Sequence, residues 1–178
     1  VNTEAPFNPD LYDRSNARDT LDLPHGIPVV LWVGRISEEK RPHEFISLIK
    51  RLATQTPVVG LMIGDGPLAG AIDKSIVELR KSKIDIRRIA QLPRQDIAKC
   101  YAAADMLVLT SLVEGLPFVA LEALATGCPV ATTNVGDLAS IIRPNETGFL
   151  VPSDRPGDLA DILANVLTEP IRLAQLRA

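Results

Sequence analysis

Short runs of β-branched and other apolar residues alternate along this chain with longer segments whose apolar residues recur every three or four positions. The short runs predict strands, and the longer segments predict amphipathic helices. Strands are expected at residues 29–33, 58–63, 84–89, 106–110, 129–133 and 148–151, and helices at 42–54, 68–82, 95–103, 117–126, 137–142 and 156–168. This alternation is typical of an α/β fold. We therefore expect a Rossmann-like open parallel sheet of about six strands with helices on both faces.

The composition permits such a core and excludes several classes of protein. The chain has 178 residues, of which 46% are hydrophobic, so it is neither disordered nor fibrous. Its 19 Lys and Arg residues are outnumbered by 22 Asp and Glu residues, for a net charge of -3. A surface for nucleic acid is therefore not expected, and any anion that the chain binds must be held locally.

The chain is expected to hold one domain. Residues 1–28 are rich in Pro, Asn and Asp and lack periodicity, so they are interpreted as a lead-in segment, with the ordered domain at residues 29–178. The sequence begins without Met and ends within the periodic stretch IRLAQLRA. We therefore expect a piece of a longer protein.

Cysteine usage and hydropathy indicate a cytoplasmic protein. Cys100 and Cys128 lack the spacing of metal ligands and are expected to be buried, reduced thiols rather than a disulfide. No stretch approaches the ~18 uninterrupted apolar residues of a membrane span. The basic run at residues 80–88 is interpreted as a solvated face. Contact with an anionic membrane, peripheral on its inner face, is the alternative.

Residues that follow the strands are the first candidates for a site, because open parallel sheets bind ligands at the carboxyl ends of their strands. After the first strand, Gly34 permits a close turn and Arg35 is the first cation. Lys40 and Arg41 follow, before Pro42, which suits a first helical turn. Such cations suit a pyrophosphate, since Arg offers a planar fork and Lys a point charge. The alternative is a solvated loop whose cations offset neighbouring glutamates.

A glycine-rich turn follows the second expected strand. Gly64 and Gly66 flank Asp65, so the chain can turn tightly and admit a ligand near its backbone. The spacing is not the dinucleotide fingerprint, because Ala69 stands at the third glycine position and Gly70 comes one place late. A plain strand-to-helix turn is the alternative.

The stretch EGLPFVALEALATG, residues 114–127, follows the fourth expected strand. Pro117 suits the start of a helix, and the free N–H groups around Phe118 and Val119 favour an anion. Glu114, on the loop before this helix, is expected to open on the same crevice.

Glu122 lies early in this helix, next to the face that should pack on the sheet. A buried and unpaired carboxylate is costly, so Glu122 either reaches water or accepts hydrogen bonds from hydroxyls. A surface glutamate near a helix start is the alternative. The packed face is expected to consist of Phe118, Leu121, Leu124 and Ala125.

Four stretches, in this order, resemble a known family: VGRISEEKR, IGDGPL, YAAADMLVLTSLVEGLPFVALEALATGCPVATTNVGDLASII and ETGFLV. They closely resemble the carboxyl-terminal domain of retaining glycosyltransferases of the group 1 (family four) class, which have the GT-B fold. The resemblance runs from about residue 29 to residue 167. Its most specific element is Glu114 and Glu122 with seven residues between them, which is the E-x7-E motif of that class.

The resemblance implies a role for each matching residue. Arg35 and Lys40 would grip the donor diphosphate and stabilise the leaving nucleoside diphosphate, Glu114 would face the hydroxyls of the donor sugar, and Glu122 would bind the ribose hydroxyls. Residues 90–92 would lie near the base, although IAQLP replaces the aromatic-glycine pair of relatives. The implied catalytic residues are Glu114, Arg35 and Lys40, and the implied donor-binding residues are Gly34, Gly64, Asp65, Gly66, Gln91, Leu92, Gly115, Leu116, Pro117, Phe118, Val119 and Glu122.

The resemblance also implies a reaction without a cofactor and without a metal ion. Retention at the anomeric carbon would proceed by front-side attack, and the protein would stabilise charge on the departing diphosphate. His25 and His43 are interpreted as a lead-in residue and a helix-start residue rather than as catalysts.

An enzyme of this class closes two domains around its substrates. The amino-terminal domain, which binds the acceptor, is expected to be missing here. The chain should then bind a nucleotide-sugar donor, transfer a hexose poorly or not at all, and self-associate through an apolar face. The acceptor is unknown. The alternatives are a sugar-nucleotide epimerase, phosphorylase or hydrolase of the same fold, and a non-catalytic nucleotide-sugar-binding module.

Overall fold

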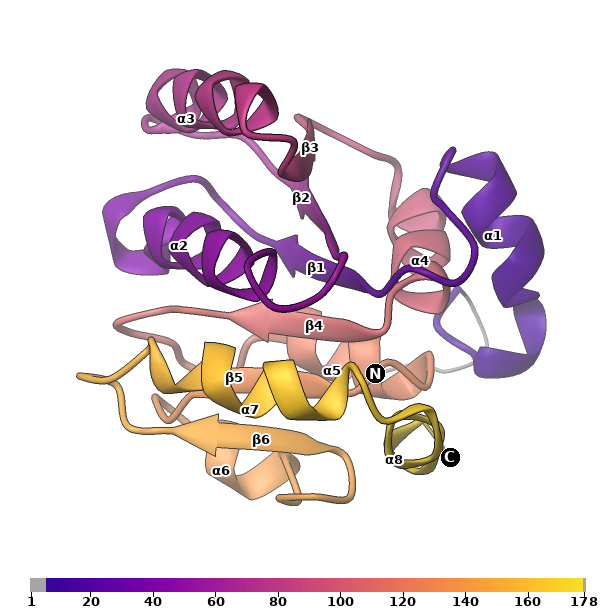
Figure 1. The fold of residues 1–178 in the computed structure, drawn as a ribbon. Coiled ribbons are helices and arrows are strands. Elements are labelled where there is room, and N and C mark those ends of the chain that lie inside the picture. The colour runs from indigo at the N-terminus through magenta and orange to yellow at the C-terminus, as the bar shows by residue number, and fades with distance from the viewer. Residues whose placement is uncertain (1–5, 178) are drawn as a thin grey trace.

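The computed structural model describes residues 6–177, which form a six-stranded parallel sheet with the strand order β3-β2-β1-β4-β5-β6 (Figure 1). The strands are β1 (Val29–Val33), β2 (Val59–Ile63), β3 (Asp85–Ile89), β4 (Met106–Leu109), β5 (Val130–Thr133) and β6 (Gly148–Val151). The order reverses between β1 and β4, which lie side by side. The predicted fold class is confirmed, and each strand lies within one residue of its expected bounds. The crevice of a doubly wound sheet belongs at this reversal.

Helices cover both faces of the sheet. They are α1 (Arg14–Thr20), α2 (Pro42–Leu52), α3 (Ala69–Lys81), α4 (Arg94–Ala103), α5 (Phe118–Ala125), α6 (Leu138–Ile141), α7 (Asp158–Val166) and α8 (Pro170–Leu176), with short 3₁₀ turns η1 (Pro9–Leu11) and η2 (Glu38–Lys40). Val30 and Trp32 of β1 point to the side of α2, α3, α7 and α8, whereas Val29 and Leu31 point to the side of α1, α4, α5 and α6. This alternation within one strand follows from the two-residue period of β structure.

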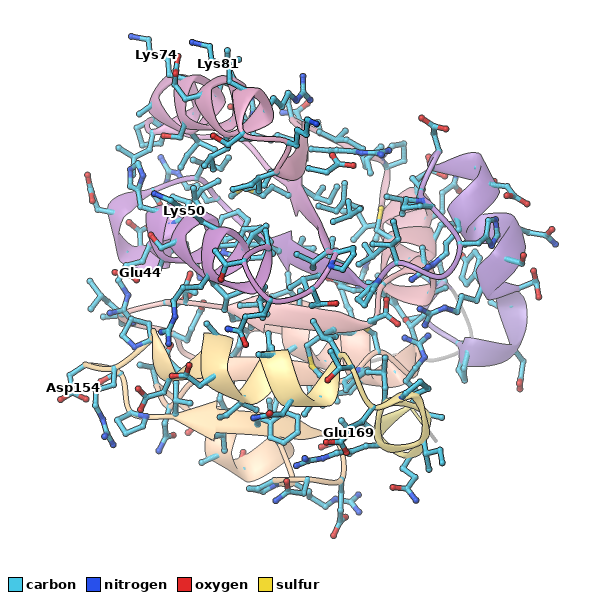
Figure 2. The ribbon with its side chains drawn as sticks, viewed as in Figure 1. Glu44, Lys50, Lys74, Lys81, Asp154 and Glu169 are labelled. Carbon is cyan, nitrogen blue, oxygen red and sulfur yellow. The ribbon has the colours of Figure 1, made fainter. Side chains whose placement is uncertain are left out.

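The outer faces of the helices are polar, as the periodicity of the sequence requires. In α3, Ile72 and Ile76 are buried against the sheet, while Lys74 and Lys81 extend outward from the molecule (Figure 2). Among the helices of residues 6–177, none is long and apolar enough to cross a membrane.

Ordered structure begins before Val29, which differs from the expected lead-in at residues 1–28. Phe7 and Leu23 are buried, and α1 packs on α4. The sequence gives little sign of this, because α1 is short and its buried residues are Ala17 and Arg18 instead of an apolar stripe. Residues 1–5 lie outside the part that the structure describes.

Three arginines hold the carboxyl end of α4 through its last carbonyl groups. Arg18 donates from Nε to Ala103 O (3.0 Å), and both Arg14 and Arg177 donate to Ala104 O. These carbonyls lie where a helix has no backbone donors left for them. Asp105, which follows directly, accepts hydrogen bonds from Arg14, from Arg18 Nη2 (2.7 Å) and from the backbone N–H at the start of β1 (2.7 Å). One buried carboxylate thus joins α1, α4 and the first strand.

The two cysteines are free and buried, as the sequence predicts. Burial raises the pKa of both Cys100 and Cys128 to about 12, so the reactive thiolate is nearly absent at neutral pH. At about pH 8, a chain unfolded in guanidinium chloride should react fully with Ellman's reagent. Over the same time, we expect the folded chain to react very little. Absorbance of the released thiol measures the reaction of both samples. Rapid modification of either cysteine in the folded chain would show that the thiols are accessible.

Candidate functional site

The loops after β1 and β2 meet at the carboxyl ends of these strands. Gly34 N donates to Ile63 O (3.0 Å), and Ile36 N donates to Asp65 O (2.9 Å). Gly64 has a φ of 148°, and a Cβ atom at this position would overlap the carbonyl oxygen of Gly34. The structure therefore explains this glycine by close approach of protein backbone, where the sequence suggested close approach of a ligand.

Arg35 is an exposed cation at the end of β1. Within residues 6–177, no side chain or carbonyl oxygen is within bonding distance of its guanidinium group, in contrast to the engaged arginines around Asp105. Its position beside the strand reversal leaves its five donors free for an anion.

Lys40, which follows β1, and Glu114, which follows β4, form an ion pair at the strand reversal. The Lys40 Nζ atom lies 2.5 Å from Glu114 Oε1, which also accepts a hydrogen bond from Ser111 Oγ (2.6 Å). The Glu114 side chain is 7% exposed and that of Lys40 is 26% exposed. Two residues that the sequence assigns to the site are thus brought into contact, although the resemblance gives each of them a ligand as its partner.

Arg41 is a structural clamp rather than a free cation. It has a φ of 46°, in the left-handed region, and its guanidinium donates to Thr110 O (2.6 Å), Ser111 O (3.0 Å) and Ser153 O (2.9 Å). Thr110 Oγ1 in turn donates to the carbonyl oxygens of Lys40 (3.0 Å) and Arg41 (2.9 Å). These bonds tie the Lys40 loop to the residues that follow β4 and β6. The sequence interpretation, which counted Arg41 among cations available to a pyrophosphate, is corrected.

The buried face of α5 differs from the expected one. Phe118 is 70% exposed, and Leu121 and Leu124 are only partly buried, whereas Ala120 and Ala123 are fully buried. Because α5 is apolar on nearly every side, its hydrophobic pattern does not select a face. The small alanines let the helix lie close to the sheet, and Phe118 is left exposed at the first position of the helix.

Glu122 lies on this buried side, with its side chain 12% exposed. Its Oε1 accepts a hydrogen bond from Arg94 Nη2 (3.0 Å), and its Oε2 accepts one from the Tyr101 hydroxyl (3.3 Å). Of the alternatives that the sequence leaves open, acceptance from a hydroxyl is the one seen. Arg94 and Tyr101 were missed, and only the rule that a buried carboxylate needs donors pointed toward them.

The remaining expected site residues lie on the loops that follow β1, β2, β3 and β4 and at the start of α5. Asp65, Gln91, Gly115 and Leu116 are exposed, and Leu92 is half-buried. Partial exposure is also found at Gly34, Gly64, Gly66 and Val119. Pro117, which directly precedes α5, is buried.

The backbone of the loop before α5 is held by another glycine. Gly136 has a φ of 56°, and a Cβ atom there would overlap the carbonyl oxygens of Glu114 and Gly115. The backbone N–H of Asp137 also donates to Gly115 O (3.2 Å). The loop after β5 therefore supports the Glu114 loop from the side.

The basic run before the crevice is engaged in ion pairs. Arg88 donates to Asp73 through Nε and Nη2 (2.7 Å each) and to Gly64 O through Nη1 (2.9 Å). This bidentate bond lowers the pKa of Asp73. Arg87 pairs with Asp85 at 2.8 Å. These contacts give Arg87 and Arg88 a structural role, whereas Arg80, Lys81 and Lys83 are exposed.

Metal-ligating side chains do not gather in the described part of the chain. Among residues 6–177, no group of three or more His, Cys, Asp or Glu side chains lies close enough to hold a metal ion. The charged candidates after β1 and β4 are instead the cations Arg35 and Lys40 and the carboxylates Glu114 and Glu122, of which Lys40 and Glu114 are in contact.

The chain is similar to known proteins over nearly its whole length. Residues 13–178 match the family model of glycosyl transferases group 1. D-inositol 3-phosphate glycosyltransferase from Rhodococcus opacus (strain B4) is 36% identical over 173 residues, which cover 93% of this chain and 39% of that protein. The chain thus spans well under half the length of this relative.

Two solved structures show the same fold. The C-terminal domain of a glycosyl transferase group 1 family protein from Francisella tularensis has a TM-score of 0.84 and 24% identity, and the match covers 99% of this chain and 92% of that one. Anabaena HepE in complex with UDP-glucose has a TM-score of 0.79 and 24% identity, and the match covers 96% of this chain and 48% of that one.

The family match extends over nearly the whole chain, and the resemblance inferred from the sequence motifs is confirmed. The strand order, the helices on both faces and the charged loops at the carboxyl ends of β1 and β4 are all parts of the matched region. This chain belongs to the family of glycosyl transferases group 1.

Proposed function

We propose that this chain binds a nucleotide-diphosphate sugar and forms the donor half of a retaining glycosyltransferase, which transfers a hexose in the complete enzyme. The observation that carries the proposal is the free guanidinium of Arg35 at the strand reversal. Arg35 lies in the same loop as Lys40, which pairs with Glu114. A diphosphate is the anion that suits a planar fork beside a point charge. In support, the structural neighbour HepE is solved with UDP-glucose.

The residues of the crevice divide the donor between them in this proposal. Arg35 and Lys40 hold the diphosphate, and Glu114, fixed by Ser111, accepts hydroxyls of the sugar. Glu122 accepts the ribose hydroxyls. As the bond to the sugar breaks, negative charge grows on the departing diphosphate, and cations already in place stabilise it without reorganising. Positive charge from the two side chains takes the part that a metal ion plays elsewhere, so the proposal includes neither a metal ion nor a cofactor.

The acceptor belongs to another part of the enzyme in this proposal. In it, this chain, with α1 and the segment before it as part of the fold, forms the nucleotide-sugar-binding domain, and an amino-terminal domain supplies the acceptor site and completes the crevice on closure. This chain alone is therefore expected to bind the donor without transferring its sugar. The proposed location is the cytoplasm, where nucleotide sugars are substrates.

Calorimetric titration with UDP, GDP and ADP and their common sugar conjugates tests the donor site. We expect one diphosphate to bind selectively, and Arg35→Ala to weaken its binding about tenfold or more, because a charge-assisted hydrogen bond contributes roughly 1.5–3 kcal/mol. Arg143→Ala is the matched control. Arg143 is also an exposed arginine, but it precedes β6 and so lies at the opposite end of the sheet. Equal weakening by both variants, or no binding by the unaltered chain, would contradict the proposal.

A further inference from the structure

Each carboxylate oxygen of Glu122 has one protein donor, and the two donors come from the same helix. Arg94 and Tyr101 lie seven positions apart on α4, on one side of that helix. The Arg94 side chain is 66% exposed, whereas Tyr101 is fully buried. Glu122 belongs to α5, and both of its carboxylate oxygens accept hydrogen bonds from side chains of α4.

Both donors rest on one buried aromatic ring. The Phe7 ring is fully buried and contacts Tyr101 edge to face, with ring centroids 6.1 Å apart and an interplanar angle of 62°. The Arg94 guanidinium carbon lies 4.9 Å above the same ring, within the range of a cation–π contact. Phe7, Arg94, Tyr101 and Glu122 thus form a closed ring of contacts that joins the segment before α1 to α4 and α5.

We propose that Tyr101 and Arg94 are positioning residues, which fix the carboxylate of Glu122 in the orientation that binds the ribose hydroxyls of the donor. The inference rests on the proposed function, since it assumes a nucleotide at the crevice. Each carboxylate oxygen has two acceptor sites, and the protein uses one on each. Among the contacts of residues 6–177, the second site on each oxygen is unused, and we assign these two sites to a pair of neighbouring hydroxyls. A carboxylate without these donors would rotate about its last bond, and binding would then have to order it.

The Tyr101 hydroxyl remains a hydrogen-bond donor to Glu122 over the ordinary pH range. Burial, together with the charge of Glu122, raises the pKa of the Tyr101 hydroxyl far above its ordinary value. The hydroxyl therefore stays protonated and always donates.

A structural role alone would also explain two donors to a buried carboxylate, so the test must separate the two roles. The readout is the ratio of dissociation constants for 2′-deoxynucleoside diphosphates and for UDP, GDP or ADP, measured by calorimetry on the unaltered chain and on Tyr101→Phe. We expect the unaltered chain to prefer the ribonucleotide, and Tyr101→Phe to reduce this preference about threefold to tenfold, as loss of one hydrogen bond predicts. Affinity for the deoxynucleotide should stay within about twofold. Tyr12→Phe, at the only other tyrosine, is the control and should leave the ratio unchanged.

Arg94→Ala repeats the test at an exposed side chain, should Tyr101→Phe fail to fold, and the same loss of ribose preference is expected. The inference would be overturned by a variant that weakens binding of the ribonucleotide and the deoxynucleotide equally. It would also be overturned if the unaltered chain bound the two nucleotides with equal affinity. Failure of the proposed function has a different signature. In that case, the unaltered chain binds no nucleotide, or Arg35→Ala leaves nucleotide binding unchanged. If binding depends on Arg35 but Tyr101→Phe and Arg94→Ala leave the preference for the ribonucleotide unchanged, only the positioning role is refuted.

Discussion

Asp105→Ala should lower the free energy of unfolding by about 3–5 kcal/mol, because it leaves buried positive charge without its partner. Arg18 is 5% exposed, and its pKa is already lowered, chiefly by burial. The variant also removes the acceptor of the first backbone N–H of β1. Arg14 and Arg18 would remain at the end of α4, held only by carbonyl groups.

Urea denaturation followed by fluorescence of Trp32 measures this loss, since Trp32 is the only tryptophan and is 1% exposed. Glu78→Ala is the control. It breaks the Lys81–Glu78 pair, in which both side chains are more than two-thirds exposed, and should change stability by less than about 1 kcal/mol. Asp105→Asn keeps an acceptor and should lie between the two. Equal stability of Asp105→Ala and Glu78→Ala would show that the buried charges find other compensation.

The sheet and its main helices could be predicted because their signals are local. Five residues of VVLWV are enough to indicate a buried strand, and the alternation with helical segments then restricts the fold. By contrast, α1 was missed because its contribution to the core is Ala17 and a buried arginine whose partner, Asp105, lies 87 residues away. A long-range ion pair leaves no periodic trace in the sequence.

The contacts of the candidate site residues could not be predicted from the sequence, although the residues themselves could be singled out as candidates. Glu114 and Glu122 stand out by their spacing, and the cations after β1 stand out by their position. The Lys40–Glu114 contact spans 74 residues, and the bond from Arg94 to Glu122 spans 28, so neither follows from composition or period. The exposed position of Phe118 was also unpredictable, because a helix that is apolar all round offers no preferred face.

Gly64→Ala should destabilise the chain by about 4 kcal/mol or more, or prevent it from folding. The methyl group would overlap the carbonyl oxygen of Gly34, which is backbone and cannot swing aside as the end of a side chain can. The φ of 148° is a further strain for any residue with a Cβ atom. Gly34 is itself bonded to Ile63 O, so relief of the overlap would separate β1 from β2 at their carboxyl ends.

Gly70→Ala is the matched control for this prediction. Gly70 lies in α3, where a methyl group would meet no atom within 4 Å, and alanine should stabilise the helix by about 0.5–1 kcal/mol. Urea denaturation of the two variants should therefore give changes of opposite sign. A Gly64→Ala chain as stable as the unaltered one would mean that the loops after β1 and β2 are free to part.

The close approach of Gly64 to Gly34 also has a consequence for the proposed donor site. Arg35 follows Gly34 directly, so the overlap at Gly64 displaces the residue that positions the proposed diphosphate ligand. Arg35→Ala should weaken nucleotide binding while leaving stability nearly unchanged, because its exposed side chain makes no hydrogen bond or ion pair within residues 6–177. Any folded Gly64→Ala chain should lose both binding and stability. Loss of both binding and stability would mean that Gly64 supports the backbone that positions Arg35. Loss of binding alone would mean that Gly64 contacts the ligand itself.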